Sequence, residues 1–440
     1  MDVSHTRVQH PVGQGFFHSG HLKDRIGTCR LRYVIDCGSK AKYKAAREKQ
    51  IDDFVKLPGS NRLLNLLMVS HIHEDHVNGI ERLLDKKSGL KVDTIMMPLT
   101  TVQERLIAFA RSIAEDASAA GSEFFRRFVI SPEEALSEFG PRQIVLVRPG
   151  APDDGAPGGT SEPDAPLPES EGQFDSDDGK PLPEWRFVGK GRIVHRTHSS
   201  RNGSANSVRI STLPDSVGIE LPVGHGDWKW LILPYVDPKV EAGIAKFERM
   251  LARRLGFKVA DVRKQMGNAD YVKDLIVKHV EELKAAYLKV ASDLNVTSLC
   301  LYSGPAAPAD KSEGRWFAGD CEVPWLGCFR LSEGGGWLGT GDAALKEKKR
   351  LDLFLEHYQH LLDQVSTLTM PHHGSERNFH PDLLDSIRPS RCVAAADDFS
   401  NWRHPGTSVV QSVASRGMPL FVATADERSE FSERLDIYFS

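Results

Sequence analysis

Four candidate metal ligands lie within six residues, namely His71, His73, Asp75 and His76. They follow the almost continuously apolar run 63–69, which is typical of a strand buried on both faces. In an extended turn His71 and His73 project the same way, because the side-chain period is two. Asp75 and His76 begin the next helix and point elsewhere. This spacing suits two neighbouring metal ions; a histidine-rich polar turn at the surface is the alternative.

Two later segments offer further ligands. The segment 337–342 (WLGTGD) is a short strand that ends in Asp342, whose carboxylate can bridge two cations. An ordinary turn or helix-capping aspartate is the alternative there. The segment 370–375 (MPHHGS) follows another apolar strand and pairs His372 with His373, for which core histidines are the alternative. Imidazole and carboxylate together suit Zn²⁺, or Mn²⁺ and Fe when more oxygen ligands join.

The composition is that of an ordinary globular protein. The 440 residues are 40% hydrophobic and 26% charged, and the formal net charge is −4. This balance excludes a histone-like or ribosomal polycation but leaves room for a local basic groove. No stretch approaches the roughly 18–20 apolar residues that cross a bilayer, and residues 1–10 lack the apolar core of a signal peptide. The six cysteines form no CxxC pair. We therefore expect a cytoplasmic protein without a membrane partner.

Strand patterns alternate with helical patterns along the whole length, which predicts an α/β class with sheets covered by helices. We expect a first half at 1–148 with the histidine cluster, an acidic flexible loop at 149–183, and a second half at 184–440. The loop is rich in Pro, Gly, Asp and Ser and has too few apolar residues to form a core. A helical insertion is expected at about 238–292, where apolar stripes recur at helical spacing.

The pattern His71-x-His73-x-Asp75-His76 resembles the signature of the metallo-β-lactamase fold superfamily. The branch that it is most similar to contains the nuclease domain of bacterial competence (DNA-uptake) proteins. The segments similar to motifs of that branch, in the same order, are VGQG at 12–15, YVIDCG at 33–38, NVTSL at 295–299, TGD at 340–342, HHGS at 372–375 and His-Pro at 404–405.

The chain departs from the family pattern in two places. The branch often has Asp at the position of His73. Many members of the superfamily also place a third histidine between the first motif and the bridging aspartate, and no motif marks it here. His195, His198 and His225 lie in that interval, but none lies in a recognisable motif. The sequence therefore leaves the remaining ligand of the first metal ion unassigned.

The resemblance implies an αββα sandwich with two divalent metal ions at one edge, between the sheets. It implies His71 and His73 as ligands of one ion and Asp75 and His76 as ligands of the other. Asp342 would bridge the two ions. One histidine of the HHGS motif would complete a shell, with His372 preferred over His373. Asp36 would orient a ligand from behind, although an aspartate before glycine also fits a plain turn.

Two cations lower the pKa of a bridging water and create hydroxide, which points to a hydrolase. Beside Asp75, the catalytic candidates are His373 and His404, either of which can protonate the leaving oxygen. For His404 a surface or turn histidine is the alternative. Asn295 and Ser298 can hold a substrate oxygen or support the sheet edge.

The favoured substrate class is a phosphodiester, with DNA or RNA as the partner. Basic side chains at 40–49 and 253–264 can track a phosphate backbone, or they can be solvated helix faces. A small-molecule hydrolase acting on a lactone, thioester, β-lactam or phosphoester is the first alternative, since the fold alone does not choose. The second alternative is a non-catalytic metal-binding scaffold.

Overall fold

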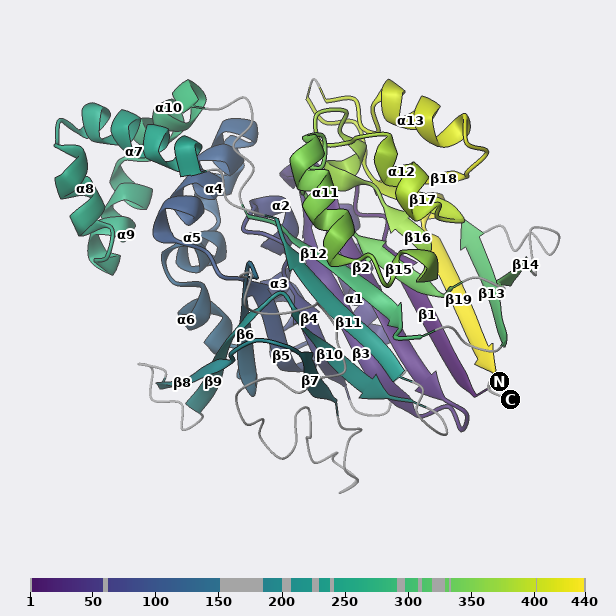
Figure 1. Cartoon of the computed structure of the whole chain (residues 1–440). Coiled ribbons are helices and arrows are strands. Elements are labelled where there is room, and N and C mark those ends of the chain that lie inside the picture. Colours follow the sequence, from purple (N-terminus) through teal and green to yellow (C-terminus); the bar gives the residue numbers. More distant parts are fainter. Residues whose placement is uncertain are drawn as a thin grey trace.

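The apolar run before the histidine cluster forms β4 (Leu63–Met68), all of whose residues are buried. It lies between β3 (Cys29–Ser39) and β5 (Lys91–Pro98), and both neighbours pair with it in parallel. Because helices cover one face of this sheet and a second sheet covers the other, the run is apolar throughout rather than alternating. Figure 1 shows the resulting four layers. The predicted αββα sandwich is confirmed.

This computed structural model describes residues 2–57, 62–150, 185–199, 207–223, 229–237, 241–290, 297–307, 311–318, 329–331, 334–400 and 402–438. Most of the predicted loop at 149–183 lies outside the described residues. No helix in the described ranges is long and apolar enough to cross a membrane.

The first sheet has the strand order β14-β13-β19-β1-β2-β3-β4-β5-β6-β9-β8. Its remaining strands are β14 (Phe329–Leu331), β13 (Lys311–Ala318), β19 (Phe431–Tyr438), β1 (Val3–Gln9), β2 (Gly15–Asp24), β6 (Gln143–Arg148), β9 (Ser207–Pro214) and β8 (Val194–Ser199). The last described strand, β19, pairs with the first, β1, so both ends of the chain meet in this sheet.

The second sheet has the order β18-β17-β16-β15-β12-β11-β10-β7. Its strands are β18 (Leu420–Ala423), β17 (Arg391–Ala395), β16 (Val365–Thr369), β15 (Gly336–Gly339), β12 (Leu299–Pro305), β11 (Lys229–Val236), β10 (Val217–Pro222) and β7 (Arg186–Gly189). The strands from β15 to β18 run parallel, so their carboxyl ends meet at one edge.

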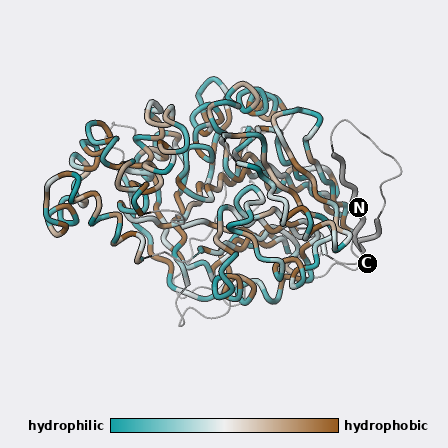
Figure 2. Tube along the Cα trace, turned by 90° about the horizontal axis from the view of Figure 1, so that it is seen from above, coloured by the Kyte–Doolittle hydropathy of each residue, from teal (hydrophilic) through white to brown (hydrophobic). Residues whose placement is uncertain are grey.

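Helices cover the outer face of each sheet. On the first sheet lie α1 (Lys44–Lys56), α2 (Glu74–Val77), α3 (Ile80–Leu83), α4 (Val102–Glu115), α5 (Glu123–Ile130) and α6 (Pro132–Ser137). On the second lie α11 (Lys348–His357), α12 (Asp382–Ile387) and α13 (Thr407–Ala414). Figure 2, seen from above, shows hydrophilic residues gathered on outer turns, as expected when each helix buries one apolar stripe.

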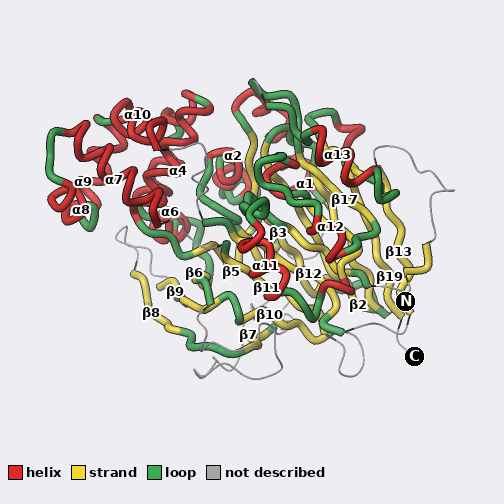
Figure 3. Tube along the Cα trace, turned by 45° about the horizontal axis from the view of Figure 1, so that its top comes forward, coloured by secondary structure: helices red, strands yellow, loops and turns green. Residues whose placement is uncertain are grey.

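Four further helices form a unit beside α4, drawn on the left of Figures 1 and 3. They are α7 (Glu241–Leu255), α8 (Val259–Gln265), α9 (Ala269–Lys278) and α10 (Val280–Val290), within the predicted insertion. Contacts join α7 and α10 to α4, and α9 to α5. Phe247, Val272 and Leu283 of this unit belong to the same apolar core as Phe109 of α4. The apolar stripes are therefore packed core.

A buried ion cluster ties the two sheets together. Glu433 of β19 pairs with Arg7 of β1 and with Arg391 of β17, which lies 3.1 Å away. Its second oxygen accepts a hydrogen bond from the Thr367 hydroxyl of β16 at 2.7 Å. Burial alone raises the pKa of Glu433, but Arg7 and Arg391 outweigh it and hold the pKa below its usual range. The carboxylate thus offsets two buried guanidinium charges at once.

We expect Glu433→Gln to lower the free energy of unfolding by about 3–5 kcal/mol, because it leaves both arginines buried without a counter-charge. The matched control is Arg434→Gln, which breaks a half-exposed pair with Asp436 and should cost about 0–1 kcal/mol. Chemical denaturation of both variants and the wild type measures the difference. Equal effects of the two substitutions would contradict the assignment.

Candidate metal centre

The predicted ligands come from strands whose carboxyl ends meet at one edge of the sandwich. His71, His73, Asp75 and His76 follow β4, with the last two inside α2. Asp342 follows β15, and the two histidines of the HHGS motif follow β16. A backbone hydrogen bond of 2.7 Å from Leu299 N–H to Ser70 C=O joins the two sheets at this point. The fold therefore brings the three motifs together between the sheets.

Asp342 lies at the centre, and its Oδ2 atom faces three imidazoles. It is 3.3 Å from Nε2 of His71, 3.8 Å from Nδ1 of His73 and 3.4 Å from Nε2 of His372. We call these three histidines, together with Oδ2, the first half-site. Burial alone raises the pKa of Asp342, but the surrounding histidines outweigh it and hold the pKa well below its usual range.

The other oxygen, Oδ1 of Asp342, faces a different group. It is 4.0 Å from Nε2 of His76 and 4.0 Å from Nε2 of His373. Asp75, His76 and His373 bring their ligand atoms within 4.8 Å of one another, and all three are buried. We call them, together with Oδ1, the second half-site. A small cavity opens here, lined in part by Asp342, His76 and His373.

Ring nitrogens of this cluster fit a metal centre. Four of the five histidines engage Nδ1 in a hydrogen bond, which leaves Nε2 directed at Asp342. The partners are the Ser70 hydroxyl for His71 (2.9 Å), Asp36 Oδ2 for His76 (2.8 Å), Asn378 Oδ1 for His372 (3.0 Å) and the Ala395 carbonyl for His373 (2.7 Å). Within the described ranges, Nε2 of His71, His73 and His76 is buried without a hydrogen-bond partner. Such atoms are costly unless something binds them.

Unusual backbone geometry holds the HHGS motif. His372, His373 and Gly374 have φ values of 48°, 58° and 81°, which places three successive residues in the left-handed region. For each histidine this costs of the order of 1–3 kcal/mol, and such strain persists where the surrounding structure enforces it. A hydrogen bond of 2.8 Å from the His372 N–H to the Gly341 carbonyl ties the turn to the Asp342 loop. The strained turn presents both imidazoles to one carboxylate.

Asp36 lies behind the centre and contacts Ser70 and His76. Its Oδ1 accepts the Ser70 N–H at 2.6 Å, and its Oδ2 accepts the Ser70 hydroxyl at 2.5 Å. The same Oδ2 contacts Nδ1 of His76. Burial alone lowers the pKa of His76, but Asp36 outweighs it and raises the pKa to about 9. Asp36 thus fixes which nitrogen of His76 faces Asp342.

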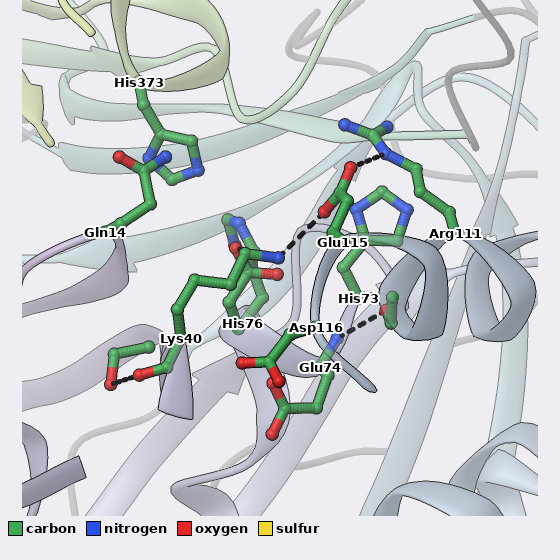
Figure 4. Close-up of polar contacts among 12 residues, drawn as sticks. Gln14, Lys40, His73, Glu74, His76, Arg111, Glu115, Asp116 and His373 are labelled. Carbon is green, nitrogen blue, oxygen red and sulfur yellow. Dashed lines mark hydrogen bonds and ion pairs between the residues drawn. The ribbon is translucent and has the colours of Figure 1, made fainter. Parts of the chain in front are cut away.

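Sequence reasoning missed three charged side chains at the centre, which Figure 4 shows. Nζ of Lys40 lies 3.2 Å from Oδ2 of Asp75 and 2.9 Å from Oε2 of Glu115. Nε of Arg111 lies 2.8 Å from Oε1 of Glu115, and its Nη2 lies 3.0 Å from Nε2 of His372. Lys40 and Arg111 are both buried, so two permanent positive charges border the predicted ligands.

The expected basic run at 40–49 is therefore not one surface. Lys40 and Arg47 are buried, and Arg47 donates to the Ser39 carbonyl at 3.1 Å. Lys42, Lys44 and Lys49 are exposed and pair with nearby carboxylates. The residues of the second run, 253–264, are mostly exposed and lie on α7 and α8 at the outer end of the helical unit (Figure 1).

The remaining predicted residues have different positions. His404 is half-buried, its ring centroid is 6.0 Å from that of His372, and burial lowers its pKa to about 4. The Ser298 hydroxyl is fully buried and accepts the Asp342 N–H at 3.0 Å, so it supports the loop of the central carboxylate. Asn295 lies outside the described residues.

No third histidine from the interval between the motifs reaches the centre among the described residues. His195 and His198 lie on β8, the edge strand four positions from β4. Four inter-strand spacings amount to roughly 19 Å. Nδ1 of His195 contacts the Ser211 hydroxyl at 2.9 Å instead. His225 lies outside the described residues.

No family model matches this sequence. No curated protein matches it either. The solved structures that are similar to the chain include unliganded yeast PDE1 (8% identity, 98% of this chain and 99% of that chain, TM-score 0.38), a beta-lactamase domain protein from Burkholderia ambifaria (22%, 28% and 34%, TM-score 0.16) and a long-form RNase Z from yeast (9%, 99% and 41%, TM-score 0.27). Identity and TM-score are low in every case.

We expect Asp36→Asn to weaken metal binding by about 10–100-fold, because the amide no longer fixes the His76 tautomer. The matched control is Asp52→Asn, which alters an exposed pair with Arg82 and should leave metal affinity unchanged. Isothermal titration of metal-free protein with Zn²⁺ measures both variants. An affinity of Asp36→Asn equal to that of the wild type would contradict the orienting role.

Proposed function

We propose that this protein is a metal-dependent hydrolase that holds two divalent cations, preferably Zn²⁺, on the two sides of Asp342. Mn²⁺ and Fe are the alternatives. The supporting observation is the position of that carboxylate, whose two oxygens face different sets of imidazoles. A buried carboxylate placed in this way suits a bridging ligand.

The proposed ligands follow the two half-sites. His71, His73 and His372 would hold one ion, with Oδ2 of Asp342. Asp75, His76 and His373 would hold the other, with Oδ1 of the same carboxylate. In this arrangement His372 would take the place of a third histidine from the interval between the motifs, and both histidines of the HHGS turn would be ligands.

Bound divalent cations would supply Lewis acidity and lower the pKa of a water molecule toward neutrality. The chain itself orients the ligands, excludes bulk water and handles the proton. His404 borders His372 and is not a member of either half-site, so it is the proposed group for protonating the leaving oxygen. Burial lowers the pKa of His404 to about 4, and the negative charge of an anionic substrate beside it would oppose that effect.

Phosphodiester bonds are the proposed substrate class. Lys40 and Arg111 add two buried positive charges to the walls of the centre, which favours an anionic substrate over a neutral lactone or β-lactam. The resemblance to competence nucleases points in the same direction and makes DNA or RNA the proposed polymer. Ser298 is buried beneath Asp342, so we propose a supporting role for it rather than direct contact with substrate.

The test is hydrolysis of bis(p-nitrophenyl) phosphate, single- and double-stranded DNA and RNA by metal-loaded protein. We expect Asp75→Ala and His76→Ala each to lower turnover by at least about 100-fold, because each loses a direct ligand. The matched control is His360→Ala, which alters an exposed histidine and should leave turnover unchanged.

The other possible results of these assays distinguish between the proposed function and its two alternatives. Turnover that is equal in the wild type and both ligand variants would contradict the proposed mechanism. Cleavage of the small diester but of no polymer would favour the small-molecule hydrolase. Metal binding without turnover of any substrate would favour the non-catalytic scaffold.

A further inference from the structure

Arg111 occupies the lone pair that a metal ion would need on His372. The amide nitrogen of Asn378 donates to the carbonyls of Asp342 and Ala343, both at 3.3 Å, so its Oδ1 is an acceptor. Nδ1 of His372, 3.0 Å from that oxygen, must therefore be the protonated nitrogen. Nε2 of His372 is then the basic nitrogen, and Nη2 of Arg111 donates to it at 3.0 Å.

The guanidinium is held firmly in this position. Nε of Arg111 donates to Oε1 of Glu115 at 2.8 Å, one turn further along α4. The other oxygen of Glu115 accepts from Lys40 at 2.9 Å, so the carboxylate joins the two cations (Figure 4). Arginine does not lose its proton in proteins, so its charge persists at every working pH.

The second half-site differs, because the buried cation there, Lys40, contacts a carboxylate and not a ring nitrogen. Lys40 contacts the Oδ2 atom of Asp75. A carboxylate has two oxygens, so the other oxygen of Asp75 is left to bind a metal ion. His373 donates through Nδ1 to the Ala395 carbonyl and directs Nε2 at Asp342. His372, by contrast, has one basic nitrogen, and Arg111 contacts it.

We infer that Arg111 makes the two half-sites unequal, so that one ion binds tightly at the second half-site and another binds weakly at the first. This inference rests on the proposed function. The weak ion binds only when the guanidinium leaves Nε2 of His372. When only the tight ion is bound, Arg111 is the second cation beside Asp342. Arg111 is thus a positioning residue that sets the metal stoichiometry.

The test is isothermal titration of metal-free protein with Zn²⁺. We expect two dissociation constants that differ by at least about 100-fold in the wild type. Arg111→Met keeps an unbranched apolar stem but removes the guanidinium, and it should strengthen the weaker site by at least about tenfold more than the tighter one. The matched control is Arg105→Met, a partly buried arginine on the same helix outside the cluster, which should change neither constant.

A second variant keeps the test decisive if Arg111→Met does not fold. His372→Gln should abolish the weak site and retain the tight one. Loss of the tight ion in His372→Gln would overturn the inference, as would two equal constants in the wild type or an unchanged weaker constant in folded Arg111→Met. The last two results leave the proposed function standing, whereas a wild type that binds no ion overturns both.

Discussion

A single buried carboxylate organises this end of the molecule. Asp342 is almost fully enclosed, and a charge in such a place is expensive unless groups of opposite charge or strong donors surround it. Five imidazoles from the two sheets surround it. In four of them Nδ1 makes a hydrogen bond elsewhere, so the neutral ring directs the lone pair of Nε2 at the carboxylate. Lone pairs that face a carboxylate are repelled by its negative charge. Bound cations between them would turn this repulsion into attraction.

Hydrogen bonds to the Nδ1 atoms keep the lone pairs of the imidazoles in place. Asp36, Ser70, Asn378 and the Ala395 carbonyl each hold one Nδ1, and the left-handed turn at 372–374 stores strain to aim two rings at once. The close approach of the loops has its own requirement. A Cβ atom at Gly341, where φ is 49°, would lie 2.5 Å from the Ser298 hydroxyl oxygen, so only glycine fits there. The strained HHGS turn and the glycine before Asp342 therefore both help to position the Asp342 carboxylate.

The sequence predicts the fold class and the clustering of the three motifs because both follow from local patterns. Buried strands have continuous apolar runs, and polar residues directly after such strands collect at one sheet edge. The role of Lys40 could not be predicted in this way, because nothing in its local sequence distinguishes it from a surface charge. A signal does exist for Arg111. It lies with Glu115 at i and i+4, yet it falls beside Ala110 and Ser112 in a stretch of α4 that is buried on nearly every side. The pairing of β19 with β1 has no local signature either, since it joins the two ends of the chain.

Helix α4 links the helical unit at 241–290 with the candidate metal centre. Helix α4 begins at a capping box between Thr101 and Glu104, and the other oxygen of Glu104 accepts the Thr297 hydroxyl. Helices α7 and α10 pack along the same helix, while its Ser112 hydroxyl accepts the N–H of Glu74 in α2. Helix α4 therefore contacts the helical unit at 241–290 and also carries Arg111, which lies beside His372.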